Sequence, residues 1–359
     1  MGSPVRFVTL AWLSVFVLAG AVLCAQRGAA PAATSPASTA DATSRIVAAA
    51  QALLTTLDDP GRAKVQFPFD GPQKTKWSNL PSGIFERTGL RVGDLTPAQR
   101  SAVMTLLSTA LSRDGYRKVM EIMRGDEVLR TTQRAGGPAR GGGGRGGGVV
   151  FGEGEYYLAF LGTPSATNAW MLQFGGHHLA INLTLAGTQA SMTPSLPAAQ
   201  PASYTIEGRT IRPLGNENDK AFALINALSE TQRSQAILTY RVADLVLAPG
   251  QDGKTIQPEG IRATALSQPQ QSMLLDLVRE WTGIVNDAFA EPRMAEIRKN
   301  VPQTYFAWSG PTTNGSAAYF RIQGPTLVIE YAPQQGSVDH IHTIYRDPTN
   351  DYGAKFTRR

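Results

Sequence analysis

The 359-residue chain has little cysteine and little charge. Its one cysteine, Cys24, lies in an N-terminal apolar stretch, so the rest of the chain has no thiol for a disulfide, a zinc–thiolate site or a nucleophile. Only 17% of the residues are charged and 42% are hydrophobic, a composition that can bury a full core and that excludes a disordered chain. Any chemistry must therefore use histidines, carboxylates, hydroxyls or a bound ligand.

Several functional signatures are also missing. The chain contains neither the Gly-x-Ser-x-Gly motif of hydrolase elbows nor a Gly-x-x-x-x-Gly-Lys-Ser/Thr phosphate-binding loop. The formal net charge is +6, but much of the excess lies near the two termini and in an Arg/Gly-rich segment, and no basic stripe with interleaved aromatic residues occurs. We therefore expect no nucleic-acid partner.

The N-terminus has the order of an export signal. Arg6 precedes an apolar stretch from Phe7 to Cys24, and a segment rich in Pro, Ala, Ser and Thr follows. We predict a signal peptide over residues 1–25 (cleavage after Ala21 is the second choice), a linker over 26–42, and a periplasmic or extracellular protein with no stable membrane insertion after cleavage. Two alternatives stay open, an uncleaved membrane anchor and lipid attachment at Cys24.

The chain resembles itself at three places in the same order, which indicates an internal duplication. We predict a single domain over residues 43–359 with two related halves, 43–215 and 216–359, the first of which contains an additional Arg/Gly-rich flexible loop over 134–149. The matching segments are Gly89–Ser101 with Gly260–Ser272, Tyr157–Gly162 with Tyr305–Gly310, and Gly176–Ile181 with Gly324–Ile329.

Each half is expected to begin with helices and to end with antiparallel strands. Thr96, Ser229 and Ser267 are each followed three residues later by Gln, the capping-box pattern of a helix start. The other expected helices cover Thr43–Leu57, Tyr116–Leu129 and Pro292–Asn300. The expected strands cover Tyr156–Leu161, Ala169–Phe174, Leu179–Leu185, Thr304–Trp308, Ala318–Ile322, Thr326–Tyr331 and His340–Tyr345. This pattern predicts an α+β fold with one sheet or two related sheets, and with the helices packed on one face.

The four histidines form two pairs, His177-His178 and His340-x-His342. If His340 and His342 lie on one strand, their side chains point to the same face. Alternation along the other strands places His178 and Glu330 on that open face as well. His178, His340, His342 and Glu330 would then form a site for a divalent metal such as zinc. Adjacent residues point to opposite faces of a strand, so only one of His177 and His178 should join.

Other interpretations of these residues stay open. The histidines could form a metal-free polar binding or acid–base site, or have a structural role only, because neither pair matches a zinc signature such as His-Glu-x-x-His. Asp347 and Asp351 could extend the site, although a local turn in which Arg346 pairs with a neighbour is favoured. The segment Trp77–Pro81 could line a pocket or could anchor a loop over the edge of a sheet.

Four segments together resemble the uncharacterised family called domain of unknown function 3500 (DUF3500): Gly175–Leu179, Trp77–Pro81, the helix start Leu95–Arg100, and His340–Gly353. The resemblance extends over nearly all of the expected mature chain and implies no activity. Two functions therefore stay open: an exported metal-binding protein or metal-dependent enzyme, and a non-catalytic exported scaffold or binder of a small molecule.

Overall fold

A computed structural model describes residues 1–2, 38–135 and 148–357. The predicted signal peptide beyond its first two residues, most of the linker and most of the Arg/Gly-rich loop lie outside the described residues. The described residues from 38 onward belong to one structural unit.

The capping boxes begin helices where the sequence predicts them. Thr96, Ser229 and Ser267 each accept a hydrogen bond from the backbone N–H of the Gln three residues on, and each Gln side chain bonds back to the backbone of the cap. The helices that follow are α3 (Pro97–Ala110), α6 (Glu230–Ala236) and α7 (Gln268–Thr282).

Three predicted helices exist but begin earlier. α1 (Thr39–Thr55) starts four residues before Thr43, because Ser38 caps it by accepting the N–H of Asp41. The other two are α4 (Arg113–Ala135) and α8 (Asp287–Asn300), which continues through Pro292.

The remaining described helices are α2 (Asp59–Val65), α5 (Gly215–Ala227) and α9 (Ala354–Thr357). The described 3-10 turns are η1 (Pro72–Thr75), η2 (Val92–Asp94), η3 (Glu153–Glu155), η4 (Ala263–Ala265), η5 (Val301–Gln303), η6 (Gln334–Gly336) and η7 (Asp351–Gly353). Of the described helices, none is both long and apolar enough to cross a membrane.

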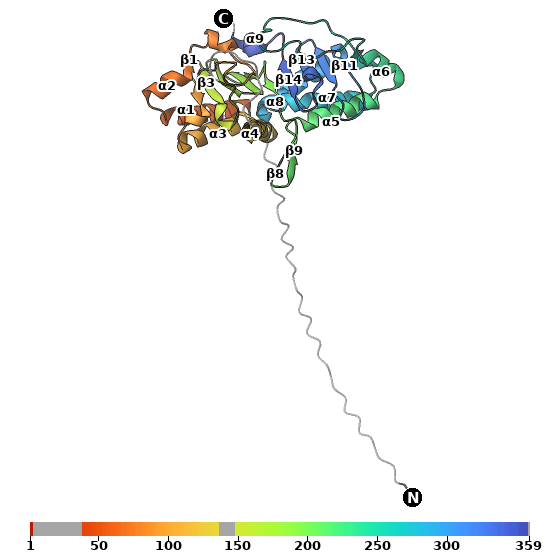
Figure 1. Ribbon diagram of the computed structural model, residues 1–359, viewed down its shortest axis with the longest axis horizontal. Helices are drawn as coiled ribbons and strands as arrows, with labels where there is room; N and C mark the ends of the chain where they lie inside the picture. The colour runs from red at the N-terminus through yellow and green to blue at the C-terminus, as the bar shows by residue number, and fades with distance from the viewer. Residues whose placement is uncertain (3–37, 136–147, 358–359) are drawn as a thin grey trace, which may run out of the picture. The chain divides into compact units, whose positions relative to one another are not determined.

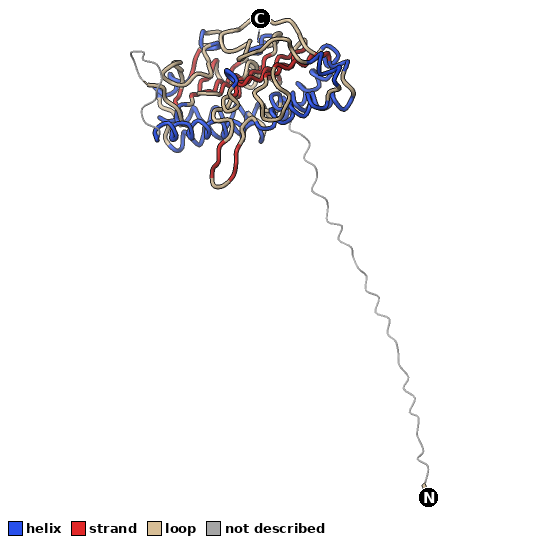
Figure 2. Tube along the Cα trace, turned by 45° about the vertical axis from the view of Figure 1, so that its right-hand side comes forward, coloured by secondary structure: helices blue, strands red, loops and turns tan. Residues whose placement is uncertain are grey.

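The strands form two main sheets, and the fold is α+β as predicted. In the first sheet the order is β1-β3-β4-β5-β6, β2 also pairs with β3, β7 also pairs with β5, and only the β1–β3 pair is parallel. Its strands are β1 (Gln66–Phe67), β2 (Leu90–Arg91), β3 (Tyr157–Leu161), β4 (Trp170–Gly176), β5 (Leu179–Ala186), β6 (Gln189–Ser191) and β7 (Leu196–Pro197). The second sheet is antiparallel in the order β10-β11-β12-β13-β14, with β10 (Ile261–Arg262), β11 (Tyr305–Ser309), β12 (Tyr319–Gly324), β13 (Leu327–Pro333) and β14 (Ile341–Arg346). The strands β8 (Tyr204–Ile206) and β9 (Arg209–Ile211) form a separate hairpin that projects from the other elements (Figures 1 and 2).

One short segment joins the two main sheets. Within it, β7 pairs with the first residues of β5. The residues on either side of β7, Ser195 and Ala199, bridge Tyr345 and Ile341 of β14. The beginning of β14 is therefore held next to the hairpin end of β4 and β5, although these strands are far apart in the sequence.

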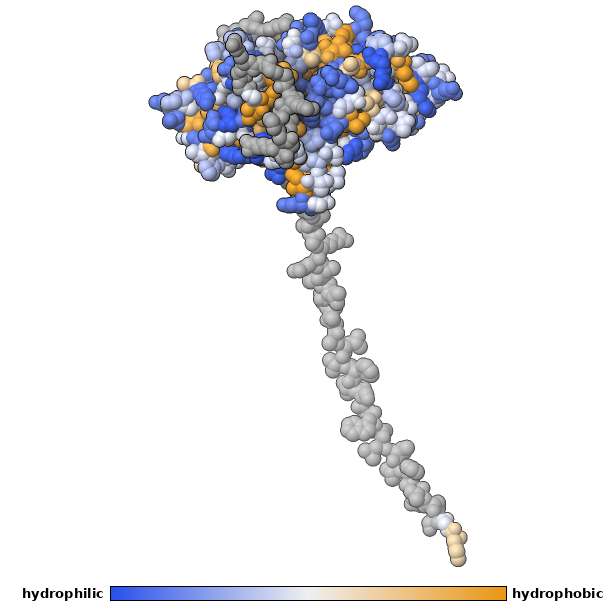
Figure 3. All heavy atoms as spheres, viewed as in Figure 1, coloured by the Kyte–Doolittle hydropathy of each residue, from blue (hydrophilic) through white to orange (hydrophobic). Residues whose placement is uncertain are grey.

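The long helices cover one face of the strands, and the other face is covered mainly by loops and by the short helix α9 (Figures 1 and 2). On the helical face Phe160, Phe174 and Ile181 of the first sheet lie in one buried apolar cluster, and Trp308 and Phe320 of the second sheet lie in another. Each such side chain contributes roughly 1.5–3 kcal/mol by leaving water. On the described surface visible in Figure 3, hydrophobic and hydrophilic residues are interspersed.

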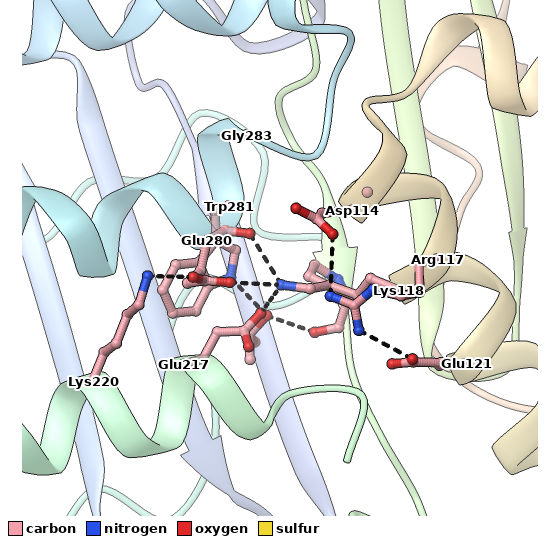
Figure 4. A network of polar contacts seen from close by, with 12 residues as sticks. Asp114, Arg117, Lys118, Glu121, Glu217, Lys220, Glu280, Trp281 and Gly283 are labelled. Atoms are coloured by element: carbon pink, nitrogen blue, oxygen red, sulfur yellow. Dashed lines mark hydrogen bonds and ion pairs between the residues drawn. The ribbon is translucent and has the colours of Figure 1, made fainter. Parts of the chain in front are cut away.

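A buried charge network connects helices that are far apart in the sequence (Figure 4). Lys118 of α4 forms ion pairs with Glu217 of α5 and, at 3.4 Å, with Glu280 of α7. Lys220 bonds the other oxygen of Glu280 at 2.5 Å. Burial raises the pKa of Glu217, against the opposing effect of Lys118. Removing one partner of such a buried pair would leave an uncompensated charge, so the network fixes α4 against α5 and α7.

Candidate metal centre

The turn between β4 and β5 carries His177 and His178. Gly176 and Leu179 form the last pair of the hairpin, so the two histidines are its turn residues. His178 has a φ of +62°, a left-handed conformation that costs a residue with a side chain about 1–2 kcal/mol. Two backbone hydrogen bonds hold the residue there: its N–H donates to Asn79 O at 3.1 Å, and its carbonyl accepts the N–H of Ala198 at 2.8 Å. Strained residues held by their surroundings are typical of functional sites.

The start of β14 carries the other pair. Ile341 and Ala199 exchange two backbone hydrogen bonds of 2.9 Å each, which places β14 beside the chain segment that also bonds His178. Because strand residues alternate between faces, His340 and His342 both point away from the helices, on the side opposite Ile341.

The structure brings His178, His340 and His342 together, and we call these residues the three-histidine centre. His178 Nε2 lies 2.9 Å from His340 Nε2, and His340 Nε2 lies 3.1 Å from His342 Nε2. One ring nitrogen from each of the three residues lies within 4.8 Å of the others. Imidazole nitrogens converging on one point are the ligand arrangement of zinc and related ions.

Asp244 determines which nitrogen of His342 carries the proton. The Asp244 carboxylate lies 2.9 Å from His342 Nδ1. Although burial raises the pKa of Asp244, the hydrogen bond and the charge of His342 outweigh this effect and lower it, so the carboxylate is ionised and can only accept. Nδ1 is therefore the protonated nitrogen, and in the neutral ring Nε2 presents a lone pair to the centre. A carboxylate behind a histidine in this way is common where histidine binds a metal.

The surroundings favour neutral rings at the other two positions. Burial lowers the pKa of His178 well below its usual value, and the neighbouring histidines lower it further. Burial and then His342 lower the pKa of His340 to about 4. Near pH 7 both rings are therefore neutral, which is the form that binds metal ions.

His177 lies behind the centre and does not join it. Its ring stacks on that of His178 at 3.7 Å between centroids, and Phe151 lies 4.9 Å from it. Its Nδ1 is 2.6 Å from Asp126 Oδ1. Only His178 belongs to the centre, as expected, but the reason differs from simple alternation: the two rings lie stacked side by side, and Asp126 binds the ring of His177.

Glu330 is not part of the group, contrary to the sequence expectation. Its carboxylate accepts the backbone N–H groups of Val246 and Leu247 at 2.9 and 2.8 Å, and also the hydroxyl of Tyr319. Glu330 pairs across the sheet with Ile344, whereas His342 pairs with Ala332. Glu330 thus lies on the predicted face but two residues further along the strand. It fastens the loop that presents Asp244 to His342.

Asp347 and Asp351 also lie outside the centre. Asp347 forms an ion pair of 3.1 Å with Arg293 and accepts from the backbone of Thr349. Asp351 pairs with Arg346 at 2.9 Å and accepts the N–H of Asp347. Asp351 therefore forms the local pair with Arg346 that the sequence favoured, whereas Asp347 combines a contact within the turn with an ion pair to α8.

The segment Trp77–Pro81 combines an anchor with a contact to the centre. Trp77 packs against Ala180 and Ile344, and its ring N–H donates to Tyr352 at 2.8 Å. Two residues on, Asn79 Nδ2 lies 3.2 Å from His342 Nε2. The sequence marked this segment without distinguishing Asn79, and it gave no signal for Asp126 or Asp244, each of which meets its histidine only through tertiary packing.

The centre is closed on one side and accessible on the other. His178 and His342 are buried, whereas His340 is half-buried and the Asp244 side chain is 40% exposed. Large aliphatic side chains are exposed on the segments that carry the site residues, and they are Leu80, Ile84, Val246 and Val338. A ligand approaching His340 would therefore meet the partly exposed carboxylate of Asp244.

A family model described as "Protein of unknown function (DUF3500)" matches residues 39–354. No curated protein and no solved structure matches the chain.

Proposed function

The chain belongs to the DUF3500 family, whose function is unknown. From the geometry of the three-histidine centre, we propose that the protein binds a divalent metal ion there. The observation that carries the proposal is the close approach of ring nitrogens from three histidines, of which one from each residue lies within 4.8 Å of the others. Neighbouring ligands of an ion with bonds of about 2.0–2.2 Å are about 2.8–3.6 Å apart, and the two Nε2 distances of 2.9 and 3.1 Å fit this range.

Hydrogen bonds between the rings explain the convergence poorly. His340 Nε2 is close to both His178 Nε2 and His342 Nε2. It can carry one proton, which cannot form a good hydrogen bond along both directions. A cation, in contrast, accepts a lone pair from each of the three rings. A borderline ion such as Zn²⁺ suits imidazole ligands.

The open side favours a catalytic centre over a purely structural one. Structural zinc sites are closed to solvent, whereas catalytic sites keep a coordination position open for water or substrate. An ion bound at this place would lower the pKa of a bound water and would polarise a substrate carbonyl or phosphoryl oxygen. Leu80, Val246 and Val338 lie within two residues of Asn79, Asp244 and His340 in the sequence and expose aliphatic side chains, which suits a substrate with an apolar part.

A second candidate function, the binding of a small molecule without catalysis, is favoured by a separate cavity. This cavity has a volume of about 390 Å³ and is lined by residues that include Phe289, Arg293, Tyr345 and Phe356. Tyr345 lies on the face of β14 opposite to His342, because the two residues are three positions apart. A ligand there would be independent of the three-histidine centre.

The proposal includes export and duplication. Export is supported by the order of Arg6, the apolar stretch and the small residues after it, and it is tested by the mass of the mature N-terminus, which we expect at Gln26. Duplication is supported by the shared element order, since β2, α3, α4, β3, β4 and β5 correspond in sequence order to β10, α7, α8, β11, β12 and β13. The centre would then lie at the junction of the two copies.

Metal analysis of the protein, purified without a polyhistidine tag, tests the metal. We expect about one equivalent of a divalent ion and a rise in melting temperature when Zn²⁺ is added to chelator-treated protein. His340→Ala and His342→Ala should lose both effects, whereas His177→Ala, which changes the one histidine outside the centre, should retain the ion. Wild-type protein with neither bound ion nor thermal shift would refute the proposal.

A further inference from the structure

Asn79 is a buried polar residue whose side chain contacts the three-histidine centre. The residue is 8% exposed, and its Nδ2 lies 3.2 Å from His342 Nε2. Since Asp244 holds the proton of His342 on Nδ1, Nε2 is an acceptor with a single lone pair. In the metal-free protein the Asn79 amide donates to that lone pair.

A bound ion would take the same lone pair. The Asn79 NH₂ group would then have no acceptor, because the lone pair of His342 Nε2 would be bonded to the ion, and it would also lie next to the positive charge of that ion. A half-turn about the Cβ–Cγ bond exchanges Nδ2 and Oδ1 with little change in shape. In the described part of the chain nothing donates to Oδ1, so the turn breaks no other hydrogen bond.

The exchanged oxygen would lie at ligand distance. It would take the place of Nδ2, 3.2 Å from His342 Nε2. This separation falls within the range of about 2.8–3.6 Å expected for neighbouring ligands of one ion. Carboxamide oxygens are ligands of divalent cations, and combined with imidazole they suit Zn²⁺, Mn²⁺ or Fe²⁺.

The backbone around Asn79 is fixed to the hairpin that carries His178. The Asn79 carbonyl accepts the N–H of His178 at 3.1 Å. Arg87 Nη2 donates to the carbonyls of Ser78, Leu80 and Gly176, and thereby connects both neighbours of Asn79 to β4. The backbone of Asn79 is therefore fixed before any ion binds, and only the terminal carboxamide has to turn.

We infer that Asn79 is a fourth ligand, through Oδ1, of the divalent ion bound by His178, His340 and His342. The inference rests on the proposed function and adds to it an oxygen ligand from a separate loop. The ion would then connect three segments that are distant in sequence, the Trp77–Pro81 loop, the β4–β5 turn and the start of β14.

Co²⁺ binding to the chelator-treated full-length protein tests this ligand, because the visible spectrum of Co²⁺ reports the number and type of ligands. Asn79→Ala should weaken Co²⁺ binding at least about tenfold and change the spectrum. Asn79→Asp, which restores an oxygen at the same place, should bind at least as tightly as wild type. Asn168→Ala, the same change at an exposed asparagine, is the matched control and should leave both affinity and spectrum unchanged.

The possible results separate the two proposals. If wild-type protein binds Co²⁺ and Asn79→Ala binds it with unchanged affinity and spectrum, Asn79 is not a ligand and the three-histidine centre stands. If wild-type protein binds no Co²⁺, the metal centre and the fourth ligand are both refuted. Thermal unfolding of the metal-free variants shows whether they are folded. If Asn79→Ala does not fold, Asn79→Asp is compared with wild type instead, and weaker Co²⁺ binding by this variant would argue against Asn79 as a ligand.

Discussion

His178 Nε2 lies 2.9 Å from His340 Nε2, although 162 residues separate the two histidines in the chain. The contact exists because the segment around β7 bonds the β4–β5 hairpin on one side and β14 on the other. Each ring is further held by groups from loops, and these supporting groups can be changed one at a time.

Asp244→Asn is expected to weaken Zn²⁺ binding about 10–100-fold. The amide keeps the shape of the side chain but removes the ionised acceptor that holds the proton of His342 on Nδ1. Competition with a chromophoric chelator measures the affinity, and Asp70→Asn, at an exposed aspartate, is the control. Equal affinities of Asp244→Asn and wild type would show that this carboxylate does not orient His342.

Glu330→Gln is expected to destabilise the protein by about 1–3 kcal/mol and to weaken metal binding as well. The new NH₂ group would face a backbone N–H of Val246 or Leu247, so the loop that carries Asp244 would lose an anchor. Urea unfolding and metal titration measure the two effects. Tyr319→Phe removes only the hydroxyl that bonds Glu330 and should affect stability alone; loss of affinity in this control would argue against the loop mechanism.

His178→Gly is expected to give a metal-free protein about 1 kcal/mol more stable than His178→Ala. Both changes remove the imidazole, but glycine adopts the φ of +62° at this position without the cost that alanine keeps. At ordinary positions a glycine variant is less stable than the alanine variant. A higher melting temperature for His178→Gly than for His178→Ala would therefore show backbone strain at this position. His178→Ala as the more stable variant would show that the turn is not strained.

Glu217→Gln is expected to change the pH dependence of unfolding. Burial raises the pKa of Glu217 in the folded protein, so its favourable contribution is complete at pH values below its unfolded pKa and is lost as the pH rises through the folded pKa. The stability of Glu217→Gln relative to wild type should therefore increase between pH 4 and pH 7, as measured by urea unfolding, with Lys118 still paired to Glu280. Glu86→Gln, at an exposed glutamate, should show no such trend, and a flat difference for Glu217→Gln would contradict the argument.

Local patterns were sufficient to predict most of the elements and the faces on which they lie. A hydroxyl and a glutamine three residues apart satisfy the free backbone groups of a helix start wherever they occur, and the three predicted capping boxes are all present. Alternation placed Glu330 and His342 on one face of the second sheet. Alternation repeats every two residues, however, so it could not tell whether Glu330 lies beside His342 or one repeat further along.

The sequence alone was sufficient for the α+β class, the family resemblance and the candidate residues of the three-histidine centre. Each of these depends on periodicity, helix caps or rare residue types, which are properties of short segments. Only the tertiary structure decided that Asp244 and Asn79, and not Glu330, surround His342. Both residues lie in loops whose positions depend on long-range contacts: Glu330 holding the backbone beyond Asp244, and Arg87 holding the backbone on both sides of Asn79. Such contacts join segments without any regular spacing, so no pattern along the chain records them.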